Sequence, residues 1–372
     1  MSDNRDGLKI LNPIGLEGNL PVFYQQLKGR LSFPLSWTSG NYQDLRQWKQ
    51  LAKSKVLECI PVIGERIPLG LEIIATENRG NYTAYKIAFN LTSLYRAPAL
   101  MLIPKANGPF PAVLLLHDHG SKFDIGKEKV IRPFNDDLRL GSAITWSKKL
   151  YGGSFIGDEL AVQGYCVLAV DALGWGERGV INYENQQALA CNLMNLGLSL
   201  AGLVAFEDLR AAELLVSLPE VDPTKVAAVG LSMGAFRSWQ LAAISANIKA
   251  GIAICWMTTT KGVMVPGNNI LRGQSAFYMT HPGLARFLDY PDVASIAAPK
   301  PMLFFNGEKD GLFPLDSVQE AYRKMRQVWH SQQADDRLET KIWPDLGHEF
   351  SRDQQNEAFQ WLERWIKPRS RT

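Results

Sequence analysis

The stretch that most constrains this chain of 372 residues is Gly230-Leu231-Ser232-Met233-Gly234. An apolar, β-branched run at residues 226–229 precedes it and predicts a buried strand. Residues 235–244 follow and are typical of a helix. A serine at such a strand-to-helix turn sits in strained backbone, with its hydroxyl lifted clear of the sheet. Glycines are expected on both sides because side chains there would clash where strand and helix approach each other.

Apolar runs and helical periodicity alternate along the rest of the chain. Further strands are predicted at residues 69–75, 82–91, 99–103, 112–117, 165–170, 250–255, 301–305 and 338–342, and helices at 41–57, 192–218, 317–330 and 354–366. This alternation predicts an α/β fold, with a doubly wound, mostly parallel sheet and helices on both faces. Ligands of such sheets bind beyond the carboxyl ends of the strands, so residues there are candidates for function.

Two such strand ends carry partners for a nucleophilic serine. Asp310 lies in a glycine-rich turn after the strand at 301–305, and Glu308 in the same turn is the competing acid. His348 follows the strand at 338–342. An imidazole can take the proton of Ser232 and later return it to a leaving group, while a buried carboxylate holds its working tautomer. Ser232, His348 and Asp310 are therefore the predicted catalytic residues.

A third strand end carries His117-Asp118-His119-Gly120. Acyl transfer places negative charge on a former carbonyl oxygen, which backbone N–H groups can stabilise. We expect one donor to be the amide of Met233, directly after the nucleophile, and the second to be the amide of His119. Ligation of a metal by His117 and His119 is the rival interpretation, but the sequence shows no second cluster to complete such a site.

These motifs resemble the α/β-hydrolase superfamily, and within it the dienelactone-hydrolase-like and acetyl xylan esterase-like serine hydrolases. The resemblance covers about residues 80–367 and rests on the Ser-Asp-His order, the histidine-containing loop and Asp171-Ala172-Leu173-Gly174-Trp175-Gly176-Glu177-Arg178. True dienelactone hydrolases use a cysteine nucleophile where this chain has Ser232, so their lactone substrate does not carry over.

The resemblance and the motifs together predict a serine hydrolase that cleaves carboxylic esters through an acyl-enzyme. Acetyl esters of carbohydrates or small molecules are the expected substrates, with no metal and no cofactor. Two alternatives stay open. One is an intracellular peptidase or amidase of the prolyl-oligopeptidase type, and the other is a non-catalytic ligand-binding protein on a hydrolase fold.

Insertions are expected to shape the pocket. We divide the chain into an N-terminal extension, residues 1–65, that packs on the body, and a catalytic domain, residues 66–372, with insertions at 121–158 and 256–296. Whether the extension contacts the active site is open. The predicted pocket lining is His117, Asp118, Trp175, Arg178 and Trp256.

Composition excludes other classes of partner. The net charge of +3 is small and the basic residues are spread along the chain, so no nucleic-acid interface is predicted. No apolar stretch approaches the roughly 20 residues that span a bilayer. Four scattered cysteines are expected to be buried reduced thiols, which, with no apolar signal core at the start, predicts a cytoplasmic location. The oligomeric state is open.

Overall fold

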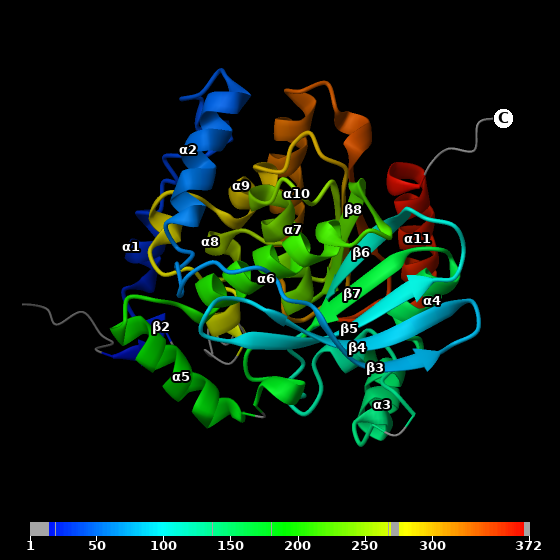
Figure 1. Ribbon diagram of the computed structural model, residues 1–372. Helices are drawn as coiled ribbons and strands as arrows, with labels where there is room; N and C mark the ends of the chain where they lie inside the picture. Colours follow the sequence, from blue (N-terminus) through cyan, green and yellow to red (C-terminus); the bar gives the residue numbers. More distant parts are fainter. Residues whose placement is uncertain are drawn as a thin grey trace, which may run out of the picture.

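The fold centres on one large sheet covered by helices on both faces (Figure 1). The computed structural model describes residues 15–18, 20–135, 137–179, 181–266, 268 and 275–367. Parts of the predicted extension (1–14 and 19) and of the two predicted insertions (136, 267 and 269–274) therefore lie outside the described residues.

Nine strands form this sheet in the order β11-β10-β9-β8-β6-β7-β5-β4-β3. Their bounds are β3 (Glu72–Asn78), β4 (Tyr82–Asn90), β5 (Arg96–Pro104), β6 (Phe110–Leu116), β7 (Cys166–Val170), β8 (Val221–Leu231), β9 (Ala250–Ile254), β10 (Met302–Gly307) and β11 (Leu338–Trp343). The strands from β11 to β7 pair in parallel, whereas β5, β4 and β3 join antiparallel at one edge. The predicted doubly wound, mostly parallel sheet is confirmed. A separate pair, β1 (Leu16–Glu17) and β2 (Leu20–Pro21), lies near the N-terminus.

The helices are α1 (Tyr24–Gly29), α2 (Leu45–Leu57), α3 (Leu140–Leu150), α4 (Ile156–Val162), α5 (Tyr183–Asn195), α6 (Leu200–Ser217), α7 (Met233–Ile244), α8 (Thr260–Val263), α9 (Tyr290–Ser295), α10 (Leu315–His330) and α11 (Arg352–Ile366). Residues of α2, α6, α7, α9 and α10 belong to one apolar cluster, and residues of α3, α4 and α11 to the other. The sheet therefore has a hydrophobic core on each face.

The uniformly apolar strand β6 shows why both faces are covered. Ala112, Leu114 and Leu116 contribute to one core, while Val113 and Leu115 contribute to the other. Successive side chains of a strand point to opposite faces, so a run without polar residues requires helices on both sides.

The prediction of a single helix at 192–218 is wrong. The structure has two helices there, α5 and α6, which meet at an angle of 88°. Gly197 adopts a left-handed φ of 75° that ends the first helix. The side chain of Ser199 accepts a hydrogen bond from the amide of Gly202 and so caps the second. No single described helix has the length and apolarity to cross a membrane; α5 and α6 reach that threshold only as a bent pair.

Helix α2 is the main element of the N-terminal segment, and it packs on α7 and α9. Its Trp48 is fully buried, and the indole N–H donates to the Leu35 carbonyl at 2.7 Å. The assignment of residues 1–65 as a separate extension stays a prediction.

The four cysteines form no disulfide. Cys166 and Cys255 are buried as expected, but Cys59 is half-buried and Cys191 is exposed on α5.

Candidate active site

Ser232 lies between β8 and α7 with φ 58° and ψ −122°, a conformation that non-glycine residues rarely adopt. Its amide donates to the Ile254 carbonyl at the end of β9, at 2.8 Å. Holding a serine in such a conformation costs on the order of 1–3 kcal/mol, which the surrounding strands must offset.

The two flanking glycines are required by close backbone approach. A Cβ atom on Gly230 would overlap the backbone of Gly234, and one on Gly234 would overlap the carbonyl of Leu116 in β6. The crowding predicted for this turn is therefore present on both sides of Ser232, and it explains why neither glycine can carry a side chain.

Asp310 and His348 are brought together from the ends of the neighbouring strands β10 and β11. His348 Nδ1 lies 2.7 Å from Asp310 Oδ2, and the Leu312 amide donates to Asp310 Oδ1 at 3.0 Å. The Asp310 side chain is 1% exposed and that of His348 is 22% exposed. The competing acid, Glu308, is exposed and accepts from the Asp345 amide at 3.2 Å. The geometry thus favours Asp310 over Glu308 as the partner of the imidazole.

The Asp310 contact sets the tautomer and the basicity of His348. A carboxylate at Nδ1 accepts the proton of that nitrogen, which leaves the Nε2 lone pair available as a base. Burial lowers the pKa of His348, but the charge and hydrogen bond of Asp310 raise it more, so the net pKa lies above the usual value. Within the described residues no hydrogen bond joins Ser232 to His348, so their contact stays a prediction.

The raised pKa of His348 predicts the pH dependence of any reaction that uses it as a base. The imidazole must be neutral to accept a proton, and a raised pKa keeps it protonated to higher pH. We expect kcat/KM for p-nitrophenyl acetate to rise with pH, with a midpoint above about 6.5, the usual histidine value. A pH profile measured with wild-type protein checks this, and a midpoint below that value would contradict it.

The amides predicted to stabilise an oxyanion are those of Met233 and His119. Neither donates a hydrogen bond to another described residue. Met233 is the first residue of α7, and the first amides of a helix have no partner within the helix. Both N–H groups are therefore unpaired within the described chain, and their role as oxyanion donors stays a prediction.

The side chains of His117 and His119 both bond within the protein. His117 Nδ1 donates to the Asp118 carbonyl at 2.9 Å, and its Nε2 accepts from the Ala172 amide at 3.0 Å. His119 Nδ1 accepts from the Ser121 amide at 3.1 Å, and its Nε2 donates to the side chain of Gln186 at 2.6 Å.

Burial lowers the pKa of His119 to about 4 and that of His117 well below its usual value, so both rings are neutral. Because all four ring nitrogens have protein partners, the geometry does not favour metal ligation by this pair.

The insertion at 121–158 braces this histidine-containing loop. Asp118 is fully buried, and its Oδ1 accepts from Trp146 Nε1 at 3.1 Å and from Tyr151 OH at 2.8 Å. The Lys129 ammonium donates to the carbonyls of Asp118 and His119 at 2.8 and 2.9 Å. Sequence reasoning did not assign Lys129 or Gln186 to the site. Lys129 lies within 11 residues of the two carbonyls it contacts, whereas Gln186 lies 67 residues from His119, too far for a local pattern to connect them.

Two of the predicted pocket residues are enclosed by other side chains. Trp175 is fully buried, with its ring centroid 5.4 Å from His117 and 4.6 Å from Tyr278. Arg178 makes two hydrogen bonds to the Glu207 carboxylate, at 2.5 and 2.7 Å. Both therefore support the fold around the histidine-containing loop, and whether either touches a ligand stays a prediction.

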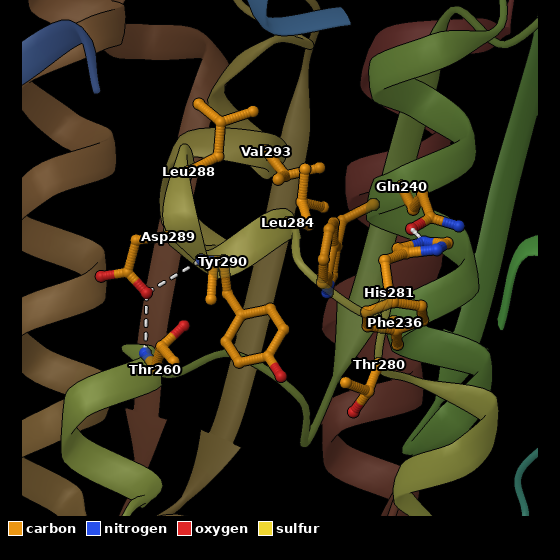
Figure 2. A pocket seen from close by; sticks show the side chains of 12 residues that line it. Phe236, Gln240, Thr260, Thr280, His281, Leu284, Leu288, Asp289, Tyr290 and Val293 are labelled. Carbon is orange, nitrogen blue, oxygen red and sulfur yellow. Dashed lines mark hydrogen bonds between the residues drawn. The ribbon is translucent and has the colours of Figure 1, made fainter. Parts of the chain in front are cut away.

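Trp256, the last predicted pocket residue, is 1% exposed. Its ring lies 5.0 Å from Phe236 and 5.5 Å from Phe313, and Phe313 stacks on His348 at 6.3 Å. A cavity of about 40 Å³ lies on the Phe236 side, between α7, α8 and the segment around α9. Figure 2 shows the side chains that line it. The lining of this cavity includes neither Ser232 nor His348. Trp256 and Phe313 thus link it to the Asp310–His348 pair through ring contacts.

One buried acidic group resembles a cation site but already holds an ammonium. The carboxylates of Glu128, Asp171 and Glu177 lie close enough together to surround a metal ion. Lys127 Nζ lies among them, 2.8 Å from Glu128, 2.7 Å from Asp171 and 2.9 Å from Glu177. Burial lowers the pKa of Lys127, but the three carboxylates raise it far more, so the ammonium stays charged and occupies the position that a cation would take.

The chain belongs to the alpha/beta hydrolase family, whose model matches residues 113–371. The Bacillus subtilis (strain 168) protein YtaP is 28% identical over 303 residues, which are 81% of this chain and 94% of that protein.

Two solved structures illustrate the likeness of fold. The glucuronoyl esterase from Solibacter usitatus has a TM-score of 0.63 at 13% identity, with 88% of this chain and 96% of that chain covered. Acetyl xylan esterase 1 from Thermoanaerobacterium sp. JW/SL YS485 has a TM-score of 0.55 at 16% identity, with 93% and 99% covered. At these identities the likeness shows a common fold.

Proposed function

We propose that this hydrolase cleaves carboxylic esters through an acyl-enzyme formed on Ser232. The observation that carries the proposal is the hydrogen-bonded pair of Asp310 and His348 at the same edge of the sheet as the strained turn of Ser232. Those strand ends are adjacent, because β8, β9, β10 and β11 are consecutive in the sheet.

The mechanism follows from the roles these groups can fill. His348 Nε2 takes the Ser232 proton as the hydroxyl oxygen attacks the acyl carbon. The amides of Met233 and His119 donate to the resulting oxyanion, and each such donor is worth about 3–4 kcal/mol. His348 then protonates the leaving alcohol, and Asp310 stabilises the imidazolium throughout. Water, activated by His348 in the same way, releases the acid and restores Ser232.

Acetyl esters of carbohydrates or small molecules are the substrate class we favour. The support is the fold shared with two proteins named as an acetyl xylan esterase and a glucuronoyl esterase. Phe313 stacks on His348 and in turn contacts Trp256, and the His348 side chain is 22% exposed, which suits a small acyl group.

A series of p-nitrophenyl esters of increasing acyl length tests the substrate class. We expect kcat/KM to fall at least about tenfold beyond the propionyl ester, since an acyl group that does not fit loses its alignment for attack. Aminoacyl p-nitroanilides serve as the comparison. A flat profile would contradict the preference for acetyl groups, and faster turnover of the anilides would favour a peptidase.

A further inference from the structure

The three segments that carry the proposed catalytic residues meet at the end of β9. The Ile254 carbonyl accepts from the amide of Ser232 at 2.8 Å. The next residue, Cys255, donates its own amide to the Phe305 carbonyl of β10, the strand that leads to Asp310, at 2.7 Å. Two consecutive residues therefore tie the serine turn to the strand that carries the carboxylate.

The side chain of Cys255 makes the third connection, to the loop of His348. Its Sγ lies 3.5 Å from the carbonyl of Glu349 and 3.8 Å from that of Gly347, the two residues that flank the histidine. The same sulfur, a ring nitrogen of His348 and a carboxylate oxygen of Asp310 all lie within 4.8 Å of one another. The thiol therefore lies beside the Asp310–His348 pair.

The protonation state of this thiol allows it to donate a hydrogen bond. Cys255 is fully buried, and burial raises the pKa of the thiol, so it keeps its proton. A neutral S–H group can donate to a carbonyl oxygen without placing a second negative charge beside Asp310. The backbone of Cys255 has a φ of 55°, so a glycine would be less strained at this position than any residue with a side chain.

We propose that Cys255 is a positioning residue. Its thiol donates to the carbonyls beside His348 and so keeps the imidazole aligned with Asp310 and Ser232. This inference rests on the proposed function, because it assigns Cys255 a part in the same catalytic arrangement. Without the thiol the histidine loop loses its connection to β9, and the imidazole samples positions in which its bond to Asp310 is longer.

Cys255→Ala and Cys255→Gly test this role, with Cys166→Ala as the matched control. Cys166 is also a fully buried cysteine of the sheet, but its sulfur contacts the Glu220 carbonyl at 3.9 Å, in the segment that precedes β8. The glycine variant relieves the left-handed backbone at position 255, so it is expected to fold even if the alanine variant does not.

The readout is the rate at which a fluorophosphonate probe labels Ser232, measured across a range of pH. We expect both Cys255 variants to label about tenfold more slowly than wild type, the scale of a small misplacement of a reacting group. The midpoint of the acidic limb should also move to lower pH, because a weaker bond to Asp310 lowers the pKa of His348. Cys166→Ala should label within about twofold of wild type.

Wild-type labelling in Cys255→Gly, or slower labelling with an unmoved acidic limb, would overturn the positioning role while the proposed function stands. Failure of the probe to label wild-type protein, or equal labelling of Ser232→Ala, would instead overturn the proposed function and this inference with it.

Discussion

Replacing Ser232 with alanine is expected to abolish turnover while leaving the fold intact. The substitution removes only the hydroxyl oxygen, and the backbone at φ 58° carries the same strain with alanine as with serine. Loss of the nucleophile from a serine triad lowers kcat by roughly 10⁴-fold or more, with a small residual rate from the remaining groups. The measurement is hydrolysis of p-nitrophenyl acetate, with circular dichroism as the test of folding.

Ser238→Ala is the matched control for this variant. Ser238 lies on α7, and its buried hydroxyl donates to the Ala228 carbonyl at 2.9 Å. Removing that hydroxyl costs about 1 kcal/mol of stability but changes no proposed catalytic group, so the rate should stay close to that of wild type. If Ser232→Ala retained the wild-type rate, the acyl-enzyme mechanism would be refuted.

Asp310→Asn is expected to have the second largest effect. An amide of the same shape no longer supplies the charge that raises the pKa of His348, and it can present its NH₂ group to Nδ1, which favours the wrong tautomer. A change of this kind lowers kcat by about 10³–10⁴-fold in a serine triad. The acidic limb of the pH profile should also move below its position in wild-type protein, because burial lowers the pKa of His348 and the variant lacks the Asp310 charge that opposes this most strongly.

Asp345→Asn provides the comparison. This aspartate lies in the loop that leads to His348, and its exposed side chain pairs with Lys309 at 2.6 Å. Because an exposed ion pair contributes little and asparagine accepts the left-handed φ of 60° at this position, kcat and its pH dependence should be unchanged. Equal effects of Asp310→Asn and Asp345→Asn would exclude Asp310 as the partner of the imidazole.

Local sequence was sufficient to predict the elements whose structure depends only on neighbouring residues. The uniformly apolar residues 112–116 predicted a strand buried on both faces, and β6 is such a strand. The glycines on either side of Ser232 predicted a crowded turn, which the backbone contacts of Gly230 and Gly234 explain. Periodicity misled where a break is short: residues 196–199 hold the turn between α5 and α6 inside a stretch whose helical periodicity continues on both sides.

Contacts between distant segments could not be predicted in the same way. Gln186 helps to hold the histidine-containing loop, yet it lies 67 residues from His119, the histidine it contacts. Cys255 lies 94 residues from Glu349, and its strand run suggested only a buried thiol. The sequence favoured Asp310 as the partner of His348, but Glu308 in the same turn stayed a competitor, because only the direction of each side chain separates them.

Amino-acid order alone thus established the sheet, the strained serine and the strand ends at which partners had to lie, because backbone sterics and hydrophobic periodicity act over a few residues. Tertiary structure decided which acid meets the imidazole, which side chains brace the loops and where the thiol points. Those outcomes depend on how strands far apart in the chain are ordered in the sheet, which no local pattern encodes.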